Sequence, residues 1–309
     1  MEKNIHTIDF EFTDSTQSEF TPVGKEGLNG KKIIFFGNSF TYYGKCVIGK
    51  GQNVYSQDKR INDKGYFYQI CKSNGIDINV CNFTFGGHQL KDFYSGSCAA
   101  NRGHNGLDHL AYINDYNYDY VVMQNGAASM NLESILAECQ PIMDRFKKAN
   151  PNVKFIFLVQ YRAHQKGYVW LSDIKNLEKS GILVVDWGRL VCDIIDGNVK
   201  VPGATQEYNF NSFVISQSKT DGFHQNMLAG YITALMTYCA LTGESAQGQQ
   251  VSFENVKALN SSGIKAYRAK YYTYKTETNF DTILASKSDM AGIQQLIDRY
   301  IEAKAYRNY

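Results

Sequence analysis

One serine of this chain stands where a nucleophile could act. Ser39 follows an apolar run at residues 33–36 and Gly37, where a strand buried on both faces would hand over to a loop or helix. In an open parallel sheet, ligands bind just beyond the carboxyl ends of the strands, so the Ser39 hydroxyl would face a crevice. A serine at such a position is otherwise a cap or turn residue, and its role therefore depends on partners elsewhere in the chain.

A base for this serine is available near residue 224. A serine hydroxyl is a weak nucleophile and normally needs a histidine that is held by a carboxylate. Asp221 precedes His224 by three residues, with Gly222 easing the turn between them. The carboxylate can then reach Nδ1 of the imidazole and leave Nε2 for the substrate-side proton. Alternatively, Asp221 caps the following helix beside a surface histidine.

Donors for an oxyanion follow two other predicted strands. Acyl transfer needs hydrogen-bond donors at the developing negative charge, each worth roughly 2.7–4 kcal/mol. Gly86 and Gly87 follow one strand, where backbone N–H groups can approach a ligand closely. Gln124 and Asn125 follow the next strand with two carboxamides. A plain turn and local capping are the alternatives, but serine, glycine, amide and Asp-x-x-His occur in this order at consecutive strand ends and a late loop.

Together these residues resemble the four sequence blocks of the SGNH hydrolases, also called GDSL-type esterases. The Gly-Asn-Ser-Phe stretch at Ser39 resembles the first block, with Asn and Phe where the family motif has Asp and Leu. Gly87 aligns with the oxyanion glycine of the second block, and Asp-Gly-Phe-His at His224 matches the last. Gln-Asn-Gly stands in place of the usual Gly-x-Asn-Asp of the third block, so Asn125 is the first candidate for the oxyanion amide and Gln124 is the alternative. The variant blocks resemble those of a bacterial subgroup of SGNH-like proteins.

The resemblance implies a three-layer α/β/α sandwich around a mainly parallel, flavodoxin-like sheet, and a serine esterase without metal or cofactor. Ser39 would attack an ester carbonyl while His224, oriented by Asp221, accepts its proton. The backbone N–H groups of Ser39 and Gly87 would hold the oxyanion together with the side-chain amide. His224 would then protonate the leaving alcohol, and water would release the acyl group by the same route. Family members act on acetylated sugars, lipids and thioesters, so the fold does not choose the substrate.

Polar and aromatic residues near the predicted strand ends give a hint of the substrate. Polar-tipped aromatic rings suit sugar hydroxyls and ring faces better than a long acyl chain. We therefore expect a short-chain ester, such as an O-acetyl group on a carbohydrate, with Asn38, His88 and Arg162 as substrate contacts. The alternatives are tyrosines that only pack the surface and a solvent-facing turn histidine at position 88. The residues that give the hint are Tyr42, Tyr43, His88, Tyr161, Arg162, His164 and Trp187.

Other classes of protein remain open at this point. Because the third block departs from the family motif, the chain could be a non-catalytic carbohydrate-binding relative, or a lipid or thioester hydrolase of the same fold. A lipase of the α/β-hydrolase type is disfavoured, because Ser39 lacks the Gly-x-Ser-x-Gly elbow. A flavodoxin-like nucleotide binder would fit the strands, but the loop after the first strand has no Gly-rich phosphate cradle.

Strands and helices alternate along the chain, which predicts a parallel sheet covered on both faces. Apolar runs predict strands at 33–36, 77–85, 120–123, 153–159 and 182–186. Helical periodicity predicts helices at 66–73, 132–146, 226–241 and 293–301. The helix at 226–241 is expected to have one apolar side, which is formed by Met227, Tyr231, Leu235, Met236 and Cys239.

The simplest domain organisation is one α/β core with additions at both ends. The core spans 31–243, which is the range of the family resemblance. An N-terminal extension at 1–30 contains a possible edge strand near Ile8. A C-terminal extension at 244–309 packs on the core and ends in a helix. A Gly- and Asn-rich stretch at about 94–106 is expected to be a surface loop or lid.

Composition excludes several kinds of partner. The 309 residues include 32 Lys and Arg against 30 Asp and Glu, a balance that argues against a nucleic-acid partner. No apolar run approaches the ~18 residues of a membrane helix, and the first residues hold no apolar signal segment, so we expect a cytoplasmic protein. Seven scattered cysteines without a Cys-x-x-Cys pair predict reduced, buried thiols. His104 and His109 with Asp108 lack the spacing of a zinc site, so no metal is expected.

Overall fold

A computed structural model gives the fold of most of the chain. It describes residues 20–42, 44, 65–85, 87–95, 108–126, 132–214, 223–251, 285 and 287–303. The edge strand expected near Ile8 and most of the lid expected at 94–106 lie outside these residues.

Five parallel strands form one sheet in the order β2-β1-β3-β4-β5. They are β1 (Lys31–Gly37), β2 (Ile78–Thr84), β3 (Tyr120–Met123), β4 (Lys154–Leu158) and β5 (Ile182–Val185). All five coincide with apolar runs of the sequence, so the predicted strands and the parallel sheet are confirmed. Strand β1 pairs with β2 on one side and β3 on the other. The residue that follows β1 therefore emerges between the ends of two neighbouring strands.

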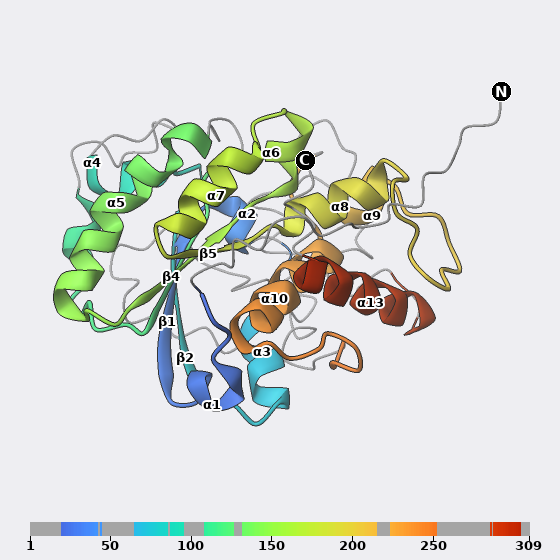
Figure 1. The fold of residues 1–309 in the computed structure, drawn as a ribbon, viewed down its shortest axis with the longest axis horizontal. Helices are drawn as coiled ribbons and strands as arrows, with labels where there is room; N and C mark the ends of the chain where they lie inside the picture. Colours follow the sequence, from blue (N-terminus) through green and yellow to red (C-terminus); the bar gives the residue numbers. More distant parts are fainter. Residues whose placement is uncertain are drawn as a thin grey trace, which may run out of the picture.

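Helices cover both faces of this sheet, as Figure 1 shows. One face carries α3 (Tyr66–Ser73), α8 (Trp187–Ile195), α10 (Met227–Thr242) and α13 (Lys287–Ala303), and the other carries α5 (Leu132–Ala149) and α7 (Leu171–Lys179). Ile33 and Phe35 of β1 enter the first core, whereas Ile34 and Phe36 enter the second. Because both faces are buried, β1 needs an unbroken apolar run rather than an alternating one. The expected three-layer α/β/α fold is confirmed.

Short helical segments occupy the connections. They are α1 (Gly24–Leu28), α2 (Ser39–Tyr42), α4 (Asp92–Ser95), the 3-10 segment η3 (His109–Tyr112), α6 (Tyr161–Gln165) and α9 (Phe210–Phe213). Two of them follow strands directly. Helix α2 comes after β1 and α6 comes after β4, so both begin at the carboxyl edge of the sheet.

Helix α10 is buried on every side, and the prediction of one apolar side was wrong. All of its residues are buried, including Thr233 and Thr237. These two hydroxyls donate to backbone carbonyls one turn earlier, at 2.8 and 2.7 Å, so their burial leaves no polar group without a partner. The helix is enclosed because α3, α8 and α13 all pack against it. Helix α13 is distant from α10 in the sequence, so the periodicity of the α10 residues cannot indicate that α13 packs against them.

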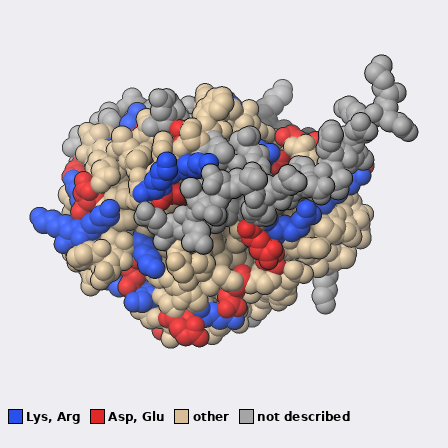
Figure 2. Space-filling model, viewed as in Figure 1, with Lys and Arg blue, Asp and Glu red and all other residues tan. Residues whose placement is uncertain are grey.

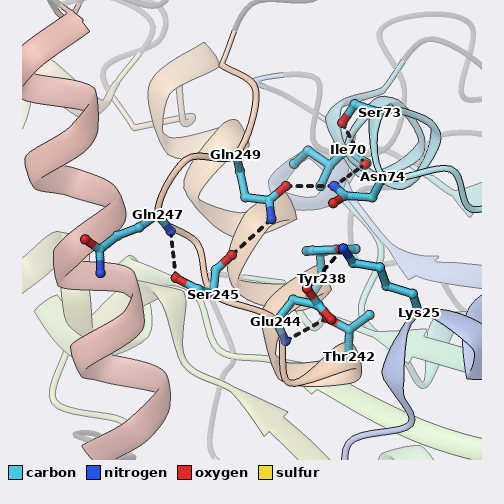
Figure 3. Close-up of polar contacts among 10 residues, drawn as sticks. All are labelled: Lys25, Ile70, Ser73, Asn74, Tyr238, Thr242, Glu244, Ser245, Gln247 and Gln249. Atoms are coloured by element: carbon cyan, nitrogen blue, oxygen red, sulfur yellow. Dashed lines mark hydrogen bonds and ion pairs between the residues drawn. The ribbon is translucent and has the colours of Figure 1, made fainter.

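The segment after α10 is held by polar contacts that Figure 3 shows. Glu244 forms an ion pair with Lys25 of α1 at 3.1 Å. Asn74, at the end of α3, donates to the side chain of Gln249 at 2.7 Å, and Gln249 donates to the carbonyl of Ser245 at 3.0 Å. Each contact is partly exposed and individually weak, but together they join this segment to α1 and α3. The division of the chain at residues 30 and 243 stays a prediction.

Charged side chains of both signs lie on the surface, and the described cysteines lie in the core. On the face drawn in Figure 2, the described basic and acidic side chains are interspersed. The five cysteines in the described residues are buried and form no disulfide with one another, which confirms the prediction for these thiols. Burial raises the pKa of Cys192 to about 12, so its reactive thiolate form is scarce at neutral pH. Among the helices of the described residues, none is long and apolar enough to cross a membrane.

Candidate active site

Ser39 begins helix α2 immediately beyond β1. A Cβ atom on Gly37 would lie 2.1 Å from Thr41 Oγ1, so only glycine lets the chain turn this tightly into the helix. The side chain of Asn38 accepts a hydrogen bond from the Phe40 backbone N–H at 3.0 Å, which caps the first turn. The Ser39 side chain is half-buried at the carboxyl edge of the sheet. This is the position that the sequence predicted.

The structure brings Ser39 and His224 together. Ser39 Oγ lies 2.7 Å from His224 Nε2, although the two residues are separated by 185 positions. At this distance the hydroxyl can donate its proton to Nε2 in the tautomer that carries hydrogen on Nδ1. The imidazole packs against the rings of Phe40 and Phe223, at centroid distances of 5.2 and 4.3 Å. Asp221, the predicted orienting carboxylate, lies outside the described residues, and its role stays a prediction.

Two hydrogen bonds beside His224 were missed by the sequence analysis. The Tyr161 hydroxyl donates to the carbonyl of Phe223, and the Gln225 side chain donates to the carbonyl of Phe40. The first bond ties the residue before His224 to α6, and the second ties the residue after His224 to α2. Of these residues, only Tyr161 could have been suspected from the sequence, as a polar aromatic residue just after a strand.

Asn38 links the ends of three strands. Its Nδ2 donates to the backbone carbonyl of His88 at 2.6 Å. A Cβ on Gly126 would lie 3.1 Å from the same Nδ2 and 3.4 Å from the same carbonyl, so the segments after β1, β2 and β3 meet here. The Asn38 side chain is 2% exposed and bonded at both ends, which argues against the predicted substrate contact.

The turn after β2 places Gly87 outside and His88 inside. Gly87 is exposed with φ +79°, a conformation that favours glycine, whereas Gly86 is not among the described residues. His88 is fully buried and stacks on His109 at 5.0 Å, with Nε2 of His88 3.2 Å from Nδ1 of His109. The solvent-facing alternative for His88 was therefore wrong. Its burial in an aromatic cluster with Phe85 also argues against a substrate contact.

The two candidate oxyanion amides point to opposite sides of the sheet. Asn125 accepts from the Leu90 and Gly126 backbone N–H groups at 2.9 and 3.0 Å. Its Nδ2 donates to Glu138 of α5 at 3.1 Å. Burial raises the pKa of the Glu138 carboxyl, and this rise is partly offset by Lys91 and by the bond from Asn125.

Gln124 contacts α2 instead, the helix that begins at Ser39. Its Nε2 donates to Thr41 Oγ1 of α2 at 3.1 Å, and its Oε1 lies 3.4 Å from the indole N–H of Trp187. Both Gln124 and Asn125 are fully buried. The contact with α2 favours Gln124 over the first candidate, Asn125, and the oxyanion role of either stays a prediction.

Several residues taken as a hint of a sugar site lie in the core. Tyr161 and Trp187 are fully buried, and Tyr42 is 7% exposed, so their rings are not available to a sugar. His164 Nε2 lies 2.7 Å from Asp186 Oδ1, the carboxylate that also caps α8. Burial argues against this hint for Tyr42, Tyr161 and Trp187, because strand-end position alone does not show which segments cover a side chain. His164 is half-buried. Tyr43 lies outside the described residues.

Arg162 is placed near the candidate base. It lies in the first turn of α6, and its Cζ is 4.8 Å from the centroid of the Phe223 ring. The Phe223 ring is 37% exposed and contacts His224, so Arg162 borders the site through one aromatic ring. Contact with a substrate stays a prediction for this residue.

The chain was compared with known proteins in sequence and in structure. No protein-family model and no curated protein matches the chain in sequence. A protein described as a putative GDSL-like lipase from Parabacteroides merdae is 14% identical, with 70% of this chain and 96% of that chain covered and a TM-score of 0.43. A catalytic mutant of an acetylxylan esterase from Geobacillus stearothermophilus is 14% identical, with 72% and 97% covered and a TM-score of 0.40. A family 2 carbohydrate esterase with a carbohydrate-binding domain from Corynascus thermopiles is 18% identical, with 70% and 68% covered and a TM-score of 0.40. These likenesses concern the fold, and the function of the present chain is inferred from its own residues.

Proposed function

We propose that this chain is a serine esterase that hydrolyses short-chain esters, acetyl esters above all, on carbohydrates. The observation that carries the proposal is the 2.7 Å contact between Ser39 Oγ and His224 Nε2 at the carboxyl edge of the sheet. A hydroxyl in hydrogen-bond contact with an imidazole, at the edge where parallel sheets bind ligands, is the minimal arrangement for acyl transfer.

The reaction follows from these two groups. Ser39 Oγ bonds to the ester carbonyl carbon while its proton passes to His224 Nε2. The carbonyl oxygen becomes an oxyanion, for which the Ser39 and Gly87 backbone N–H groups and one carboxamide are the proposed donors. His224 returns the proton to the leaving alcohol as the C–O bond breaks. Water then gives its proton to His224 and attacks the acyl-enzyme, which releases the carboxylic acid and restores Ser39. Asp221 is the proposed orienting carboxylate.

An exposed aromatic ring supports a sugar as the alcohol part. Phe223 is 37% exposed, and its ring centroid lies 4.3 Å from that of His224. An exposed aromatic side chain beside the base gives an apolar contact for the C–H groups of a pyranose ring. The tilted rings of Phe40 and Phe223 both border the imidazole, which is an apolar surrounding that also suits a small acyl group.

A panel of nitrophenyl esters tests this function directly. We expect hydrolysis of p-nitrophenyl acetate but not of the decanoate, and a loss of at least about 1,000-fold in kcat for Ser39→Ala. The matched control is Ser73→Ala, which removes a hydroxyl at the C-terminal end of α3 and should retain the wild-type rate. A fluorophosphonate probe should label the wild-type protein and the control but not Ser39→Ala.

Three results would contradict the proposal. Preference for the decanoate would indicate a lipid hydrolase of the same fold. Full activity in Ser39→Ala would remove Ser39 as the nucleophile. A folded wild-type protein that neither hydrolyses esters nor reacts with the probe would leave the non-catalytic carbohydrate-binding alternative.

A further inference from the structure

Arg162 carries a positive charge one aromatic ring away from the proposed catalytic base. It lies in the first turn of α6, the short helix that follows β4 at the carboxyl edge of the sheet. Its Cζ is 4.8 Å from the Phe223 ring centroid, and that ring is 4.3 Å from the His224 ring. The guanidinium, the exposed ring and the imidazole therefore form a continuous row that ends at Ser39.

The charge of Arg162 is not balanced within the part of the chain that the structure describes. The other arginines near ionised side chains are paired: Arg145 with Asp108 at 2.7 Å and Arg189 with Asp193 at 2.8 Å. No ion pair between described residues includes Arg162, and its Nε is buried without a hydrogen-bond partner. The guanidinium therefore has no anionic partner among the described residues that would compete with an anionic ligand.

We propose that Arg162 recognises a negatively charged group on the alcohol part of the ester. The preferred substrate is then a short-chain ester of an acidic sugar, one that bears a carboxylate or a phosphate. A guanidinium offers several N–H donors in one plane, which match the paired oxygens of both anions. The anionic group belongs to the alcohol part of the ester, because an acetyl group has no ionisable group. This inference rests on the esterase function proposed above.

Arg162 could instead act only by holding Phe223 in place. A cation over an aromatic ring stabilises the contact whether or not a substrate is present. In that case the loss of Arg162 would slow every substrate by the same factor, because Phe223 precedes the base. Recognition of an anion predicts a different result, in which the loss depends on the charge of the substrate.

Three acetylated sugars separate these two roles. They are an O-acetylated methyl glucoside, the corresponding methyl glucuronoside, and the methyl glucoside 6-phosphate, and acetate release measures kcat and KM for each. We expect the wild-type kcat/KM to be roughly 10–100-fold higher for at least one acidic sugar than for the neutral one, as a charge-assisted hydrogen bond provides. Most of this preference should lie in KM and should shrink as salt is added. Arg162→Gln should abolish the preference, and Arg162→Lys should restore part of it.

Lys166→Gln is the matched control, because Lys166 is an exposed cation at the end of the same helix. It removes one positive charge from the same surface and should keep the preference for the acidic sugar. An equal rate on all three sugars by the wild-type enzyme, or an equal loss on all three in Arg162→Gln, would overturn the proposal. Either result leaves the esterase function intact as long as the neutral sugar is hydrolysed in a Ser39-dependent way. A wild-type enzyme that hydrolyses none of the sugars and no nitrophenyl ester would overturn both proposals.

Discussion

At the scale of single residues, Asn125 joins three parts of the molecule through one carboxamide. Its oxygen accepts from the backbone of Leu90 and Gly126, and its nitrogen donates to Glu138 on α5. The side chain is fully buried. Asn125 therefore holds the turn after β2 against the end of β3, the two segments that carry the proposed oxyanion donors.

Asn125→Ala should lower the free energy of unfolding by about 1–3 kcal/mol, because the buried Leu90 N–H loses its acceptor. Urea denaturation measures this change. Asn117→Ala, at an exposed asparagine, is the control and should stay within about 0.5 kcal/mol of the wild type. If Asn125→Ala instead keeps its stability and loses about 100-fold in kcat, then Asn125 is an oxyanion donor and not a structural link.

The sequence predicted the pairing of Ser39 with His224 but not the surroundings of either residue. The pairing follows from topology, because the carboxyl ends of parallel strands share one edge and the loop before α10 returns to it. Asn38 and His88 were predicted to contact substrate because they adjoin the motif residues. Both are buried by segments from elsewhere in the chain, and a local motif does not indicate which segments will cover its residues.

At the scale of elements, the apolar runs were sufficient to predict all five strands. Each strand is covered on both faces, and this burial is what an unbroken run of apolar residues indicates. Helix α10 is the contrasting case, since its full burial depends on α13, and helical periodicity reports only one helix at a time. The close approach of α10 to Gly44 is another feature that no pattern predicted.

This close approach depends on two glycines, Gly44 and Gly230. A Cβ on Gly230 of α10 would lie 1.9 Å from the carbonyl oxygen of Gly44. Gly230→Ala should therefore destabilise the protein by about 1–3 kcal/mol through overpacking, although alanine is the better helix former. It should also lower kcat, because Gly44 lies two residues beyond the end of α2, the helix that begins at Ser39. Thermal unfolding and the acetate assay measure the two effects.

Gly75→Ala is the comparison variant for this prediction. A Cβ at Gly75 would meet no atom within 4 Å, but its φ of +76° imposes strain on alanine. We expect a loss of stability at Gly75 with unchanged kcat, whereas Gly230→Ala should affect both quantities. A gain of stability in Gly230→Ala, as at an ordinary helical glycine, would show that the two segments do not approach so closely.

At the scale of the whole molecule, the C-terminal helix shares the main core. Ile293, Leu296 and Ile297 of α13 are fully buried in the same cluster as Ile33 and Phe35 of β1. The Tyr300 hydroxyl donates to Asp193 of α8 at 2.6 Å, and the buried carboxylate of Asp289 accepts from Thr205 and Tyr208. A helix with this much buried apolar and polar contact should unfold together with the sheet.

Ile293→Ala tests whether the region after residue 243 is a separate unit. Removing this fully buried side chain should cost about 2–5 kcal/mol, and the thermal transition should remain single and shift as a whole. Scanning calorimetry measures both properties, and Gln295→Ala, at an exposed position of the same helix, should leave the transition in place. A variant in which one early transition separates from an unshifted main one would show that α13 unfolds independently, and that the sheet with its Ser39–His224 pair is stable without it.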